Sequence, residues 1–280
     1  MNSIMLGPAK RIMMCKPTHY QVKYQINPWM NVKRRADNER AQKQWLELKA
    51  TIEKCGATVE VMEPEGAENL PDIVFCANAA IIRGKRAYVS HFAHRQREGE
   101  HVFYEKWLKS KGYQTFYNDN IRHEGTGDAL WCSQGMNTLI SGVGTRSDMR
   151  AAADIRTKMN QEGKDDFQVV CARLVDPRFY HIDVCFCPLN ENLALFYPNA
   201  FDPVSQNNMK NYTTMLEVPE KDALKFACNA VVIGKNVILH EGAKETEKML
   251  EMNGFIPHAV DMSEFLKAGG SSKCCTLRLE

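Results

Sequence analysis

Long apolar stretches are missing from this sequence. No run approaches the about 18 consecutive apolar residues that a membrane-spanning helix needs, and residues 1–15 hold too short and interrupted an apolar run for a secretory signal peptide. An excess of one charge is also lacking, since 36 basic residues face 34 acidic ones and the two kinds are interleaved. We therefore expect a cytoplasmic globular protein that binds neither nucleic acid nor membranes.

Cysteine is plentiful, but its placement does not indicate a disulfide framework. Ten cysteines are spread thinly along 280 residues without an export signal, which favours reduced thiols. Most of them stand within apolar runs such as residues 183–188, where a thiol behaves as a small apolar side chain. Zinc is an alternative for Cys185 and Cys187 with His181, and for the pair Cys274 and Cys275. The one-residue spacing of the first pair and the adjacency of the second are not typical of structural zinc sites.

One pattern recurs along the chain. A polar residue opens an apolar run, a turn rich in Gly or Asn follows, and a second apolar run returns, as in a β-hairpin. The copies are residues 78–90, 128–142, 183–198 and 229–240. A fifth can be assembled from the two chain ends, where residues 10–16 and 273–279 read as strands that pair and close a ring.

Helical spacing of apolar residues predicts helices between these hairpins. The segments are 37–55, 99–112, 147–162 and 243–253. In three cases a glycine and a short apolar run come next, which indicates a helix end followed by a strand. Repeats of roughly 50 residues predict a toroidal or propeller-like α/β array, organised as a single domain over residues 1–280.

Such an array gathers the first residue of each hairpin at its centre. These residues are Asn78, Asp128, Asp183 and Asn229. Polar residues at the inner ends of apolar strands suit a ligand site, although Asn and Asp also cap turns throughout proteins. Both interpretations stay open at this point.

Three segments hold residues capable of chemistry. His181 and Asp183 are two positions apart, hence on one side of a predicted strand, although a lone buried His is more often a core residue. Cys274 and Cys275 open the last predicted strand and alternate, so only one can point inward as a nucleophile, while the alternative is a pair of packed thiols. Glu124 in a glycine-rich turn could orient a histidine or could be an ordinary surface acid.

Taken together, these motifs resemble the guanidine-modifying, or pentein, superfamily. The motifs are residues 70–78 (LPDIVFCAN), 124–128 (EGTGD), 181–183 (HID) and 269–274 (GGSSKC). The superfamily includes arginine deiminase, dimethylargininase, agmatine deiminase and glycine amidinotransferase, and the resemblance implies a five-bladed α/β propeller of ββαβ repeats. Residues 24–30 (YQINPWM) and 178–189 (RFYHIDVCFCPL) are most similar to the catalytic domain of bacterial arginine dihydrolase, and the likeness runs nearly end to end.

The resemblance implies a role for each matching residue. It makes Cys274 the nucleophile, His181 the general acid and base, and Glu124 the acid that orients the histidine. Asp183 would hold the guanidinium, and Arg97 with Arg146 would bind the substrate carboxylate, a task that suits the bidentate guanidinium fork. The remaining contacts to substrate would come from Asp72, Phe75, Asn78, Asn27 and Ala268. The resemblance implies no metal or organic cofactor. A homodimer is expected only because members of the superfamily are often dimeric.

Asn78 departs from part of that family. Deiminases and dimethylargininases carry aspartate there, whereas dihydrolase-like proteins carry asparagine, whose amide can both donate and accept hydrogen bonds. Ala77 likewise lacks the acid of dimethylargininases. The sequence thus predicts hydrolysis of arginine to ornithine, carbon dioxide and two ammonia. A dimethylargininase, a non-catalytic arginine sensor and an amidinotransferase remain alternatives.

Overall fold

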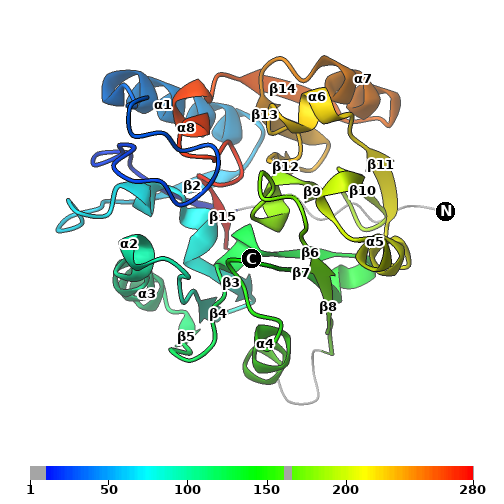
Figure 1. Cartoon of the computed structure of the whole chain (residues 1–280), viewed down its shortest axis with the longest axis horizontal. Coiled ribbons are helices and arrows are strands. Elements are labelled where there is room, and N and C mark those ends of the chain that lie inside the picture. The colour runs from blue at the N-terminus through cyan, green and yellow to red at the C-terminus, as the bar shows by residue number, and fades with distance from the viewer. Residues whose placement is uncertain (1–10, 161–165, 280) are drawn as a thin grey trace.

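Five three-stranded sheets make up the described part of the chain. The computed structural model describes residues 11–160 and 166–279. Viewed down the short axis, the sheets surround a common centre and the longer helices lie around the rim (Figure 1). In every sheet the middle strand is antiparallel to one neighbour and parallel to the other. The predicted five-bladed α/β propeller is therefore confirmed.

Each blade follows the order strand, strand, helix, strand. The first strands are β3 (Ala80–Arg83), β6 (Ala129–Cys132), β9 (Phe186–Pro188), β12 (Val231–Ile233) and β15 (Leu277–Arg278). The middle strands are β4 (Arg86–Val89), β7 (Thr138–Val143), β10 (Leu193–Phe196), β13 (Asn236–His240) and β1 (Arg11–Cys15). The third strands are β5 (Gln114–Phe116), β8 (Gln168–Arg173), β11 (Thr214–Glu217), β14 (Ile256–Val260) and β2 (Thr58–Met62).

Helices join the middle and third strands. They are α1 (Asn38–Lys54), α3 (Glu100–Ser110), α4 (Ala151–Met159), α5 (Pro203–Lys210) and α7 (Lys244–Met252), and the short α2 (Arg95–Glu98) precedes α3 in the same connection. The short helices α6 (Glu220–Ala223) and α8 (Ser263–Leu266) instead follow the third strands of their blades. In α1 the spacing of Trp45, Leu48 and Ile52 puts all three on the core side, where each is at most 2% exposed. Burial of each such side chain contributes about 2 kcal/mol, so packing rather than propensity holds the helix.

The predicted hairpins and the closure by the chain ends are confirmed. Ile12 of β1 pairs with Arg278 of β15, which joins the two ends in one sheet. Residue 10 of the predicted first strand and residues 161 and 162 of the predicted third helix lie outside the described residues. Helix α5 was not predicted, although Asp202, whose carboxylate accepts from the amides of Val204 and Ser205, precedes a proline at the first helical position.

Two local predictions were wrong. His181 and Asp183 do not lie in a strand, because the 3₁₀ turn η5 (Ile182–Val184) intervenes before β9 begins at Phe186. Cys274 and Cys275 also precede their strand, since β15 begins at Leu277. In both places hydrogen bonds to neighbouring blades replace the ladder bonds that a strand would have made.

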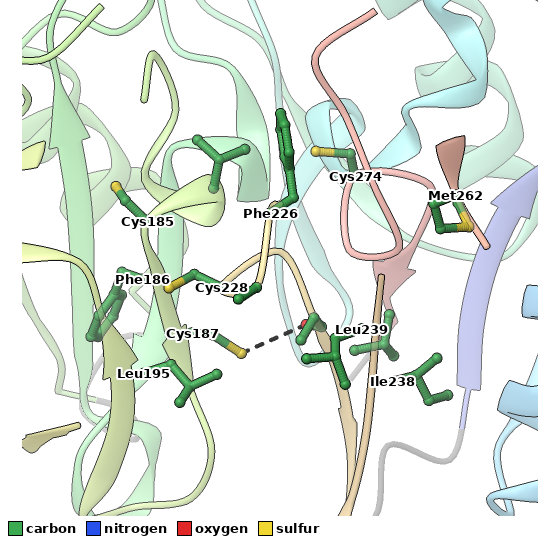
Figure 2. Packing of buried hydrophobic residues seen from close by; sticks show 14 of the residues in the cluster. Cys185, Phe186, Cys187, Leu195, Phe226, Cys228, Ile238, Leu239, Met262 and Cys274 are labelled. Carbon is green, nitrogen blue, oxygen red and sulfur yellow. Dashed lines mark hydrogen bonds between the residues drawn. The ribbon is translucent and has the colours of Figure 1, made fainter. Parts of the chain in front are cut away.

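The core holds most of the cysteines as free thiols. Figure 2 shows Cys185, Cys187 and Cys228 among apolar side chains such as Phe186 and Leu195. The Cys187 thiol donates to the carbonyl oxygen of Ala230 at 3.7 Å, and all ten cysteines are unpaired with one another. In the described ranges, no helix is long and apolar enough to cross a membrane.

Candidate active site

A small pocket of about 250 Å³ collects residues from several blades. Its lining is Ile26, Asn27, Met30, Asp72, Phe75, Asn78, Arg97, Arg146, Tyr180, Ala268, Gly270 and Cys274. Glycine is required at Gly270, because a Cβ there would lie 2.5 Å from Cε1 of Phe75 and 3.2 Å from Cβ of Cys274. The Gly-Gly pair thus lets the backbone approach the pocket closely.

Cys274 is held in place by Asn229. The Asn229 Oδ1 accepts from the backbone amides of Ser271 and Cys274 at 3.2 and 3.1 Å. Its Nδ2 donates to the Cys274 sulfur at 3.1 Å and to the carbonyl oxygen of Asp183 at 3.0 Å. One buried amide therefore fixes the thiol and the segment that carries Asp183.

The thiol faces a carboxylate. Cys274 Sγ lies 3.4 Å from Oδ2 of Asp183. Burial raises the pKa of Cys274 well above its usual value, and the neighbouring Asp183 raises it further. Burial also raises the pKa of Asp183 itself to about 6. The site without a ligand therefore favours a neutral thiol, and a cation placed between the two groups would favour the thiolate.

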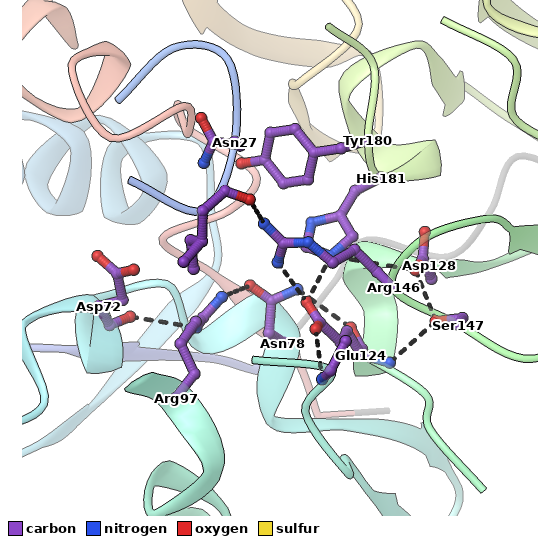
Figure 3. Close-up of polar contacts among 12 residues, drawn as sticks. Asn27, Asp72, Asn78, Arg97, Glu124, Asp128, Arg146, Ser147, Tyr180 and His181 are labelled. Atoms are coloured by element: carbon purple, nitrogen blue, oxygen red, sulfur yellow. Dashed lines mark hydrogen bonds and ion pairs between the residues drawn. The ribbon is translucent and has the colours of Figure 1, made fainter. Parts of the chain in front are cut away.

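Behind the pocket, His181 and Glu124 form a buried pair (Figure 3). His181 Nε2 lies 2.7 Å from Oε2 of Glu124, which also accepts from Nη1 of Arg146 at 2.9 Å. Burial lowers the pKa of His181 to about 4, against the opposing effect of Glu124. Burial opposes ionisation of Glu124 as well, but Arg146 and His181 together hold its pKa well below the ordinary value. A neutral imidazole bonded to a carboxylate is the result, as a general base requires.

Asp128 bonds to the residues that directly follow His181 and Arg146 in the sequence. Its Oδ1 accepts from the backbone amide of Ile182 at 3.2 Å, and its Oδ2 accepts from Ser147 Oγ at 2.6 Å. The four hairpin starts Asn78, Asp128, Asp183 and Asn229 are each at most 3% exposed. Hydrogen bonds bring three of them together, since Asp128 accepts from the amide of Ile182 and Asn229 donates to the carbonyl oxygen of Asp183. Of the four, Asn78 alone lines the pocket.

Arg97 also lines the pocket and holds Asn78 in place. It donates from Nε and Nη2 to the two carboxylate oxygens of Glu100 at 2.8 and 2.7 Å, and from Nη1 to Oδ1 of Asn78 at 2.9 Å. The Asn78 Nδ2 in turn donates to the carbonyl oxygen of Glu124 at 3.1 Å. Arg97 therefore fixes which end of the Asn78 amide faces each neighbour.

Two buried carboxylate oxygens have no hydrogen-bond partner among the described residues. They are Oδ1 of Asp183 and Oδ1 of Asp72, whose Oδ2 accepts from the Tyr24 hydroxyl at 2.9 Å. Buried acceptors without donors are costly, so they indicate a missing partner. Arginine has two cationic groups, the guanidinium and the α-ammonium, that could supply these donors.

Comparison with known proteins agrees with this geometry. Residues 9–280 match the sequence profile of eukaryotic N,N dimethylarginine dimethylhydrolase. The chain belongs to this family of pentein proteins.

Relatives within the family have more than one activity. The bifunctional arginine dihydrolase/ornithine cyclodeaminase ArgZ of Synechocystis sp. is 38% identical over 275 residues, which are 96% of this chain but 37% of ArgZ. The dimethylarginine dimethylaminohydrolase of Mycobacterium tuberculosis is 37% identical over 272 residues, 97% of this chain and 86% of that protein. The chain thus spans little more than a third of the bifunctional relative.

The ArgZ N-terminal domain also matches in three dimensions. Its Cys→Ser variant bound to substrate superposes with a TM-score of 0.90 at 38% identity, covering 96% of this chain and 97% of that domain. The same domain has been observed with product and, as an Asn→Ser variant, bound covalently to a reaction intermediate.

In this family member the residues predicted from sequence come together. Eight of the predicted residues line the pocket: Asn27, Asp72, Phe75, Asn78, Arg97, Arg146, Ala268 and Cys274. Asp183, His181 and Glu124 lie behind that lining, each at most 1% exposed. Arg97 and Arg146, predicted to bind a carboxylate of the substrate, bond in this structure to Glu100 and Glu124. Their roles in binding and catalysis stay predictions.

Three further residues contribute to the site and were not predicted as functional. Asn229 was treated only as a hairpin start, yet it holds Cys274. Tyr180 lines the pocket beneath the Arg146 guanidinium, 4.7 Å from its ring centroid, and stands directly before His181 in the sequence. Glu100 neutralises Arg97, and the spacing of three residues on neighbouring helical segments is the signal that could have found it. Among the described residues no three His, Cys, Asp or Glu side chains are grouped as metal ligands.

Proposed function

We propose that this chain hydrolyses the guanidino group of L-arginine through a covalent intermediate on Cys274. The net reaction combines arginine with two waters and gives ornithine, carbon dioxide and two ammonia. His181 acts as the proton carrier and Asp183 binds the guanidinium. The proposal applies to the described domain, which corresponds to the dihydrolase part of the bifunctional relative.

The observation that carries the proposal is the pairing of Cys274 with Asp183. A nucleophilic sulfur 3.4 Å from a buried carboxylate is the arrangement required to bring a planar cation within reach of attack. The unpartnered Oδ1 of Asp183 offers the same cation a further acceptor. Asp72 and Arg146, which also line the pocket, offer opposite charges to the α-ammonium and α-carboxylate of an amino acid.

The proposed first hydrolysis uses these residues in turn. The guanidinium binds to Asp183, the thiol proton passes to His181, and the Cys274 sulfur forms a bond to the guanidinium carbon. His181 returns the proton to the leaving nitrogen, the C–N bond breaks, and ammonia departs from an S-alkylthiouronium. Water that gives a proton to His181 then attacks the same carbon, the C–S bond breaks, and citrulline forms with regeneration of the thiol.

The second hydrolysis repeats the steps on the ureido group of citrulline. Cys274 attacks the ureido carbon, ammonia leaves, and water releases a carbamate that decomposes to ornithine and carbon dioxide. A neutral ureido group has both donors and acceptors, and the Asn78 amide suits it better than a carboxylate does. Asn78 is thereby proposed to retain citrulline long enough for a second attack.

A second candidate is hydrolysis of methylated arginine to citrulline and a methylamine. It is favoured by the match over residues 9–280 to the dimethylarginine dimethylhydrolase profile. The chemistry on Cys274 is the same, and only the leaving amine differs. The two candidates therefore depend on the space and polarity beside the guanidinium.

Product analysis tests the proposal. The purified protein is incubated with L-arginine, asymmetric dimethylarginine, citrulline and agmatine, and ammonia, methylamines, citrulline and ornithine are measured by mass spectrometry. We expect ornithine and two ammonia per arginine, and no product from Cys274→Ser. Citrulline with dimethylamine from the methylated substrate alone would support the second candidate. Turnover unchanged in Cys274→Ser would contradict both.

A further inference from the structure

Lys273, the residue before Cys274, lines a different cavity from the one that Cys274 lines. Cys274 lines the small pocket, whereas Lys273 lines a separate cavity of about 760 Å³. That second cavity is bounded largely by apolar side chains of the blades, among them Leu130, Phe186 and Val231. Lys273 is half-buried at this place, and its ammonium has a hydrogen-bond partner there, the hydroxyl of Thr126.

Lys273 completes a chain of hydrogen bonds that returns to Cys274, the residue next to it. Its Nζ donates to Thr126 Oγ1 at 3.0 Å, and that hydroxyl donates to the carbonyl oxygen of Ala77 at 2.8 Å. The Ala77 amide donates back to the carbonyl oxygen of Cys274 at 3.0 Å. Thr126 lies in the 3₁₀ turn η3 (Gly125–Gly127) directly after Glu124. These hydrogen bonds therefore join the peptide of Cys274 to the turn that follows Glu124, the residue that pairs with His181.

The charge of Lys273 acts on Asp183 without a direct ion pair between the two described residues. In the parts of the chain that the structure describes, no Asp or Glu oxygen forms an ion pair with its Nζ within 4.0 Å. Its field acts instead on the site: it opposes the effect of burial on the pKa of Asp183, and it also opposes the rise in the pKa of Cys274. The other titratable groups coupled to these two residues, all uncharged or anionic, are Asp128, Tyr180, Cys185, Cys187 and Cys275.

A cation outside the substrate pocket favours two ionisations that the proposed reaction requires. Asp183 has to be ionised to bind a guanidinium, and Cys274 has to become a thiolate, although both are buried beside each other. A cation directly beside the bound guanidinium would repel it. Lys273 reaches the two groups from the opposite side and leaves the pocket free.

We propose that Lys273 is a positioning residue that fixes the peptide of Cys274 through Thr126 and supplies the positive charge that keeps Asp183 ionised and Cys274 reactive. The inference rests on the proposed function, because it takes Cys274 as nucleophile and Asp183 as guanidinium ligand. The two parts of the role, charge and bracing, are separable by substitution.

Alkylation of Cys274 by iodoacetamide as a function of pH tests the charge without any substrate. Mass spectrometry of the Cys274 peptide distinguishes this thiol from Cys55 and Cys171, which are half-buried. Lys273→Met removes charge and donor, Lys273→Gln keeps a shorter donor without charge, and Lys273→Arg keeps both. In the first two variants we expect the midpoint to rise by about one pH unit, hence about tenfold slower alkylation near pH 7, and in Lys273→Arg a midpoint near that of the parent.

Thr126→Val is the matched control for bracing, because it removes the acceptor of Lys273 and leaves the charge. It should lower the melting temperature with a smaller shift of the midpoint than Lys273→Gln. An alkylation profile of Lys273→Gln equal to that of the parent would overturn the inference, even if Lys273→Met failed to fold. The acid limb of kcat/KM should move to higher pH in Lys273→Gln. If the parent turned over no amidine, the proposed function would fail while the alkylation series still decided the role of Lys273.

Discussion

The thiol of Cys274 donates to the Asp183 carboxylate across 3.4 Å, so the nucleophile and the proposed guanidinium ligand are direct neighbours. The carboxylate raises the pKa of the thiol, whereas the hydrogen bond that the thiol donates lowers the pKa of Asp183, so the pair favours a carboxylate beside a neutral thiol. A guanidinium that enters between them attracts both the carboxylate and a thiolate, so it favours ionisation of the thiol. Reactivity of the thiol is therefore coupled to the charge of whatever occupies the pocket.

This coupling predicts selective alkylation by a cation. Cationic 2-chloroacetamidine should modify Cys274 at least about tenfold faster than neutral 2-chloroacetamide at pH 7, after correction by their rates with glutathione, because Asp183 attracts the amidinium and the amidinium favours the thiolate. Peptide mass spectrometry gives both rates. Asp183→Asn should remove the preference. A corrected ratio near one in the parent protein would contradict the coupling.

Loss of the Asn229 side chain should lower the free energy of unfolding. Asn229→Ala leaves the buried amides of Ser271 and Cys274 without an acceptor. Each unpaired amide costs about 1 to 3 kcal/mol, so the free energy of unfolding should fall by about 2 kcal/mol or more in urea titrations. Asn236→Ala, at the other end of the same hairpin, is the control and should cost less than about 1 kcal/mol. Equal losses in the two variants would refute the proposed anchoring.

Gly269 and Gly254 allow backbone strain to be separated from damage to the pocket. Both have positive φ, +83° and +80°, so alanine at either costs about 1 kcal/mol. A Cβ at Gly269 would lie 2.8 Å from Asn27 Oδ1 and 2.9 Å from the Tyr180 hydroxyl, while a Cβ at Gly254 meets nothing within 4 Å. We expect similar losses of melting temperature but a rise in KM only in Gly269→Ala. Steady-state kinetics that fail to distinguish the two variants would be inconsistent with this view of the lining.

Asn78→Asp should uncouple the two hydrolyses. The substituted carboxylate can still accept from Arg97, but it cannot donate to the carbonyl oxygen of Glu124 as the Asn78 amide does. It also prefers a cation to a neutral ureido group. The ammonia released per arginine should fall from about two towards one as citrulline accumulates, as measured by mass spectrometry. Continued formation of ornithine by Asn78→Asp would argue against the proposed role of the amide.

His123 predicts a stability that falls in acid. Burial lowers its folded-state pKa from 6.5 to about 4, while its Nδ1 accepts from the amide of Gly125 at 3.2 Å. The unfolded chain thus binds more protons between those values, so the contribution is present above pH 6.5 and is lost as the pH falls towards 4. Between pH 7.5 and 5.5 this histidine should account for about 1 kcal/mol of the loss in unfolding free energy. In His123→Asn the urea-measured pH dependence should be smaller by that amount, and an unchanged dependence would disprove the assignment.

The sequence by itself determined the blades. The hairpin beginning at Asn78, the closure of β1 by β15 and helix α1 all depend on alternation, turn residues and helical spacing within short segments, where local physics prevails. The resemblance to a known superfamily, which carried positions over one by one, also named residues such as Cys274 and Asp72 that line one pocket in the structure, while their roles stay predictions.

Only the tertiary structure decided how those residues act on one another. His181 and Asp183 lie at a 3₁₀ turn and not in a strand, because contacts from Asp128 and Asn229 replace the ladder. The position of Lys273 behind Cys274 depends on a segment far away in the chain, because its Nζ donates to Thr126. Charge, desolvation and hydrogen bonding at that range are properties of the packed ring, and no local pattern encodes them.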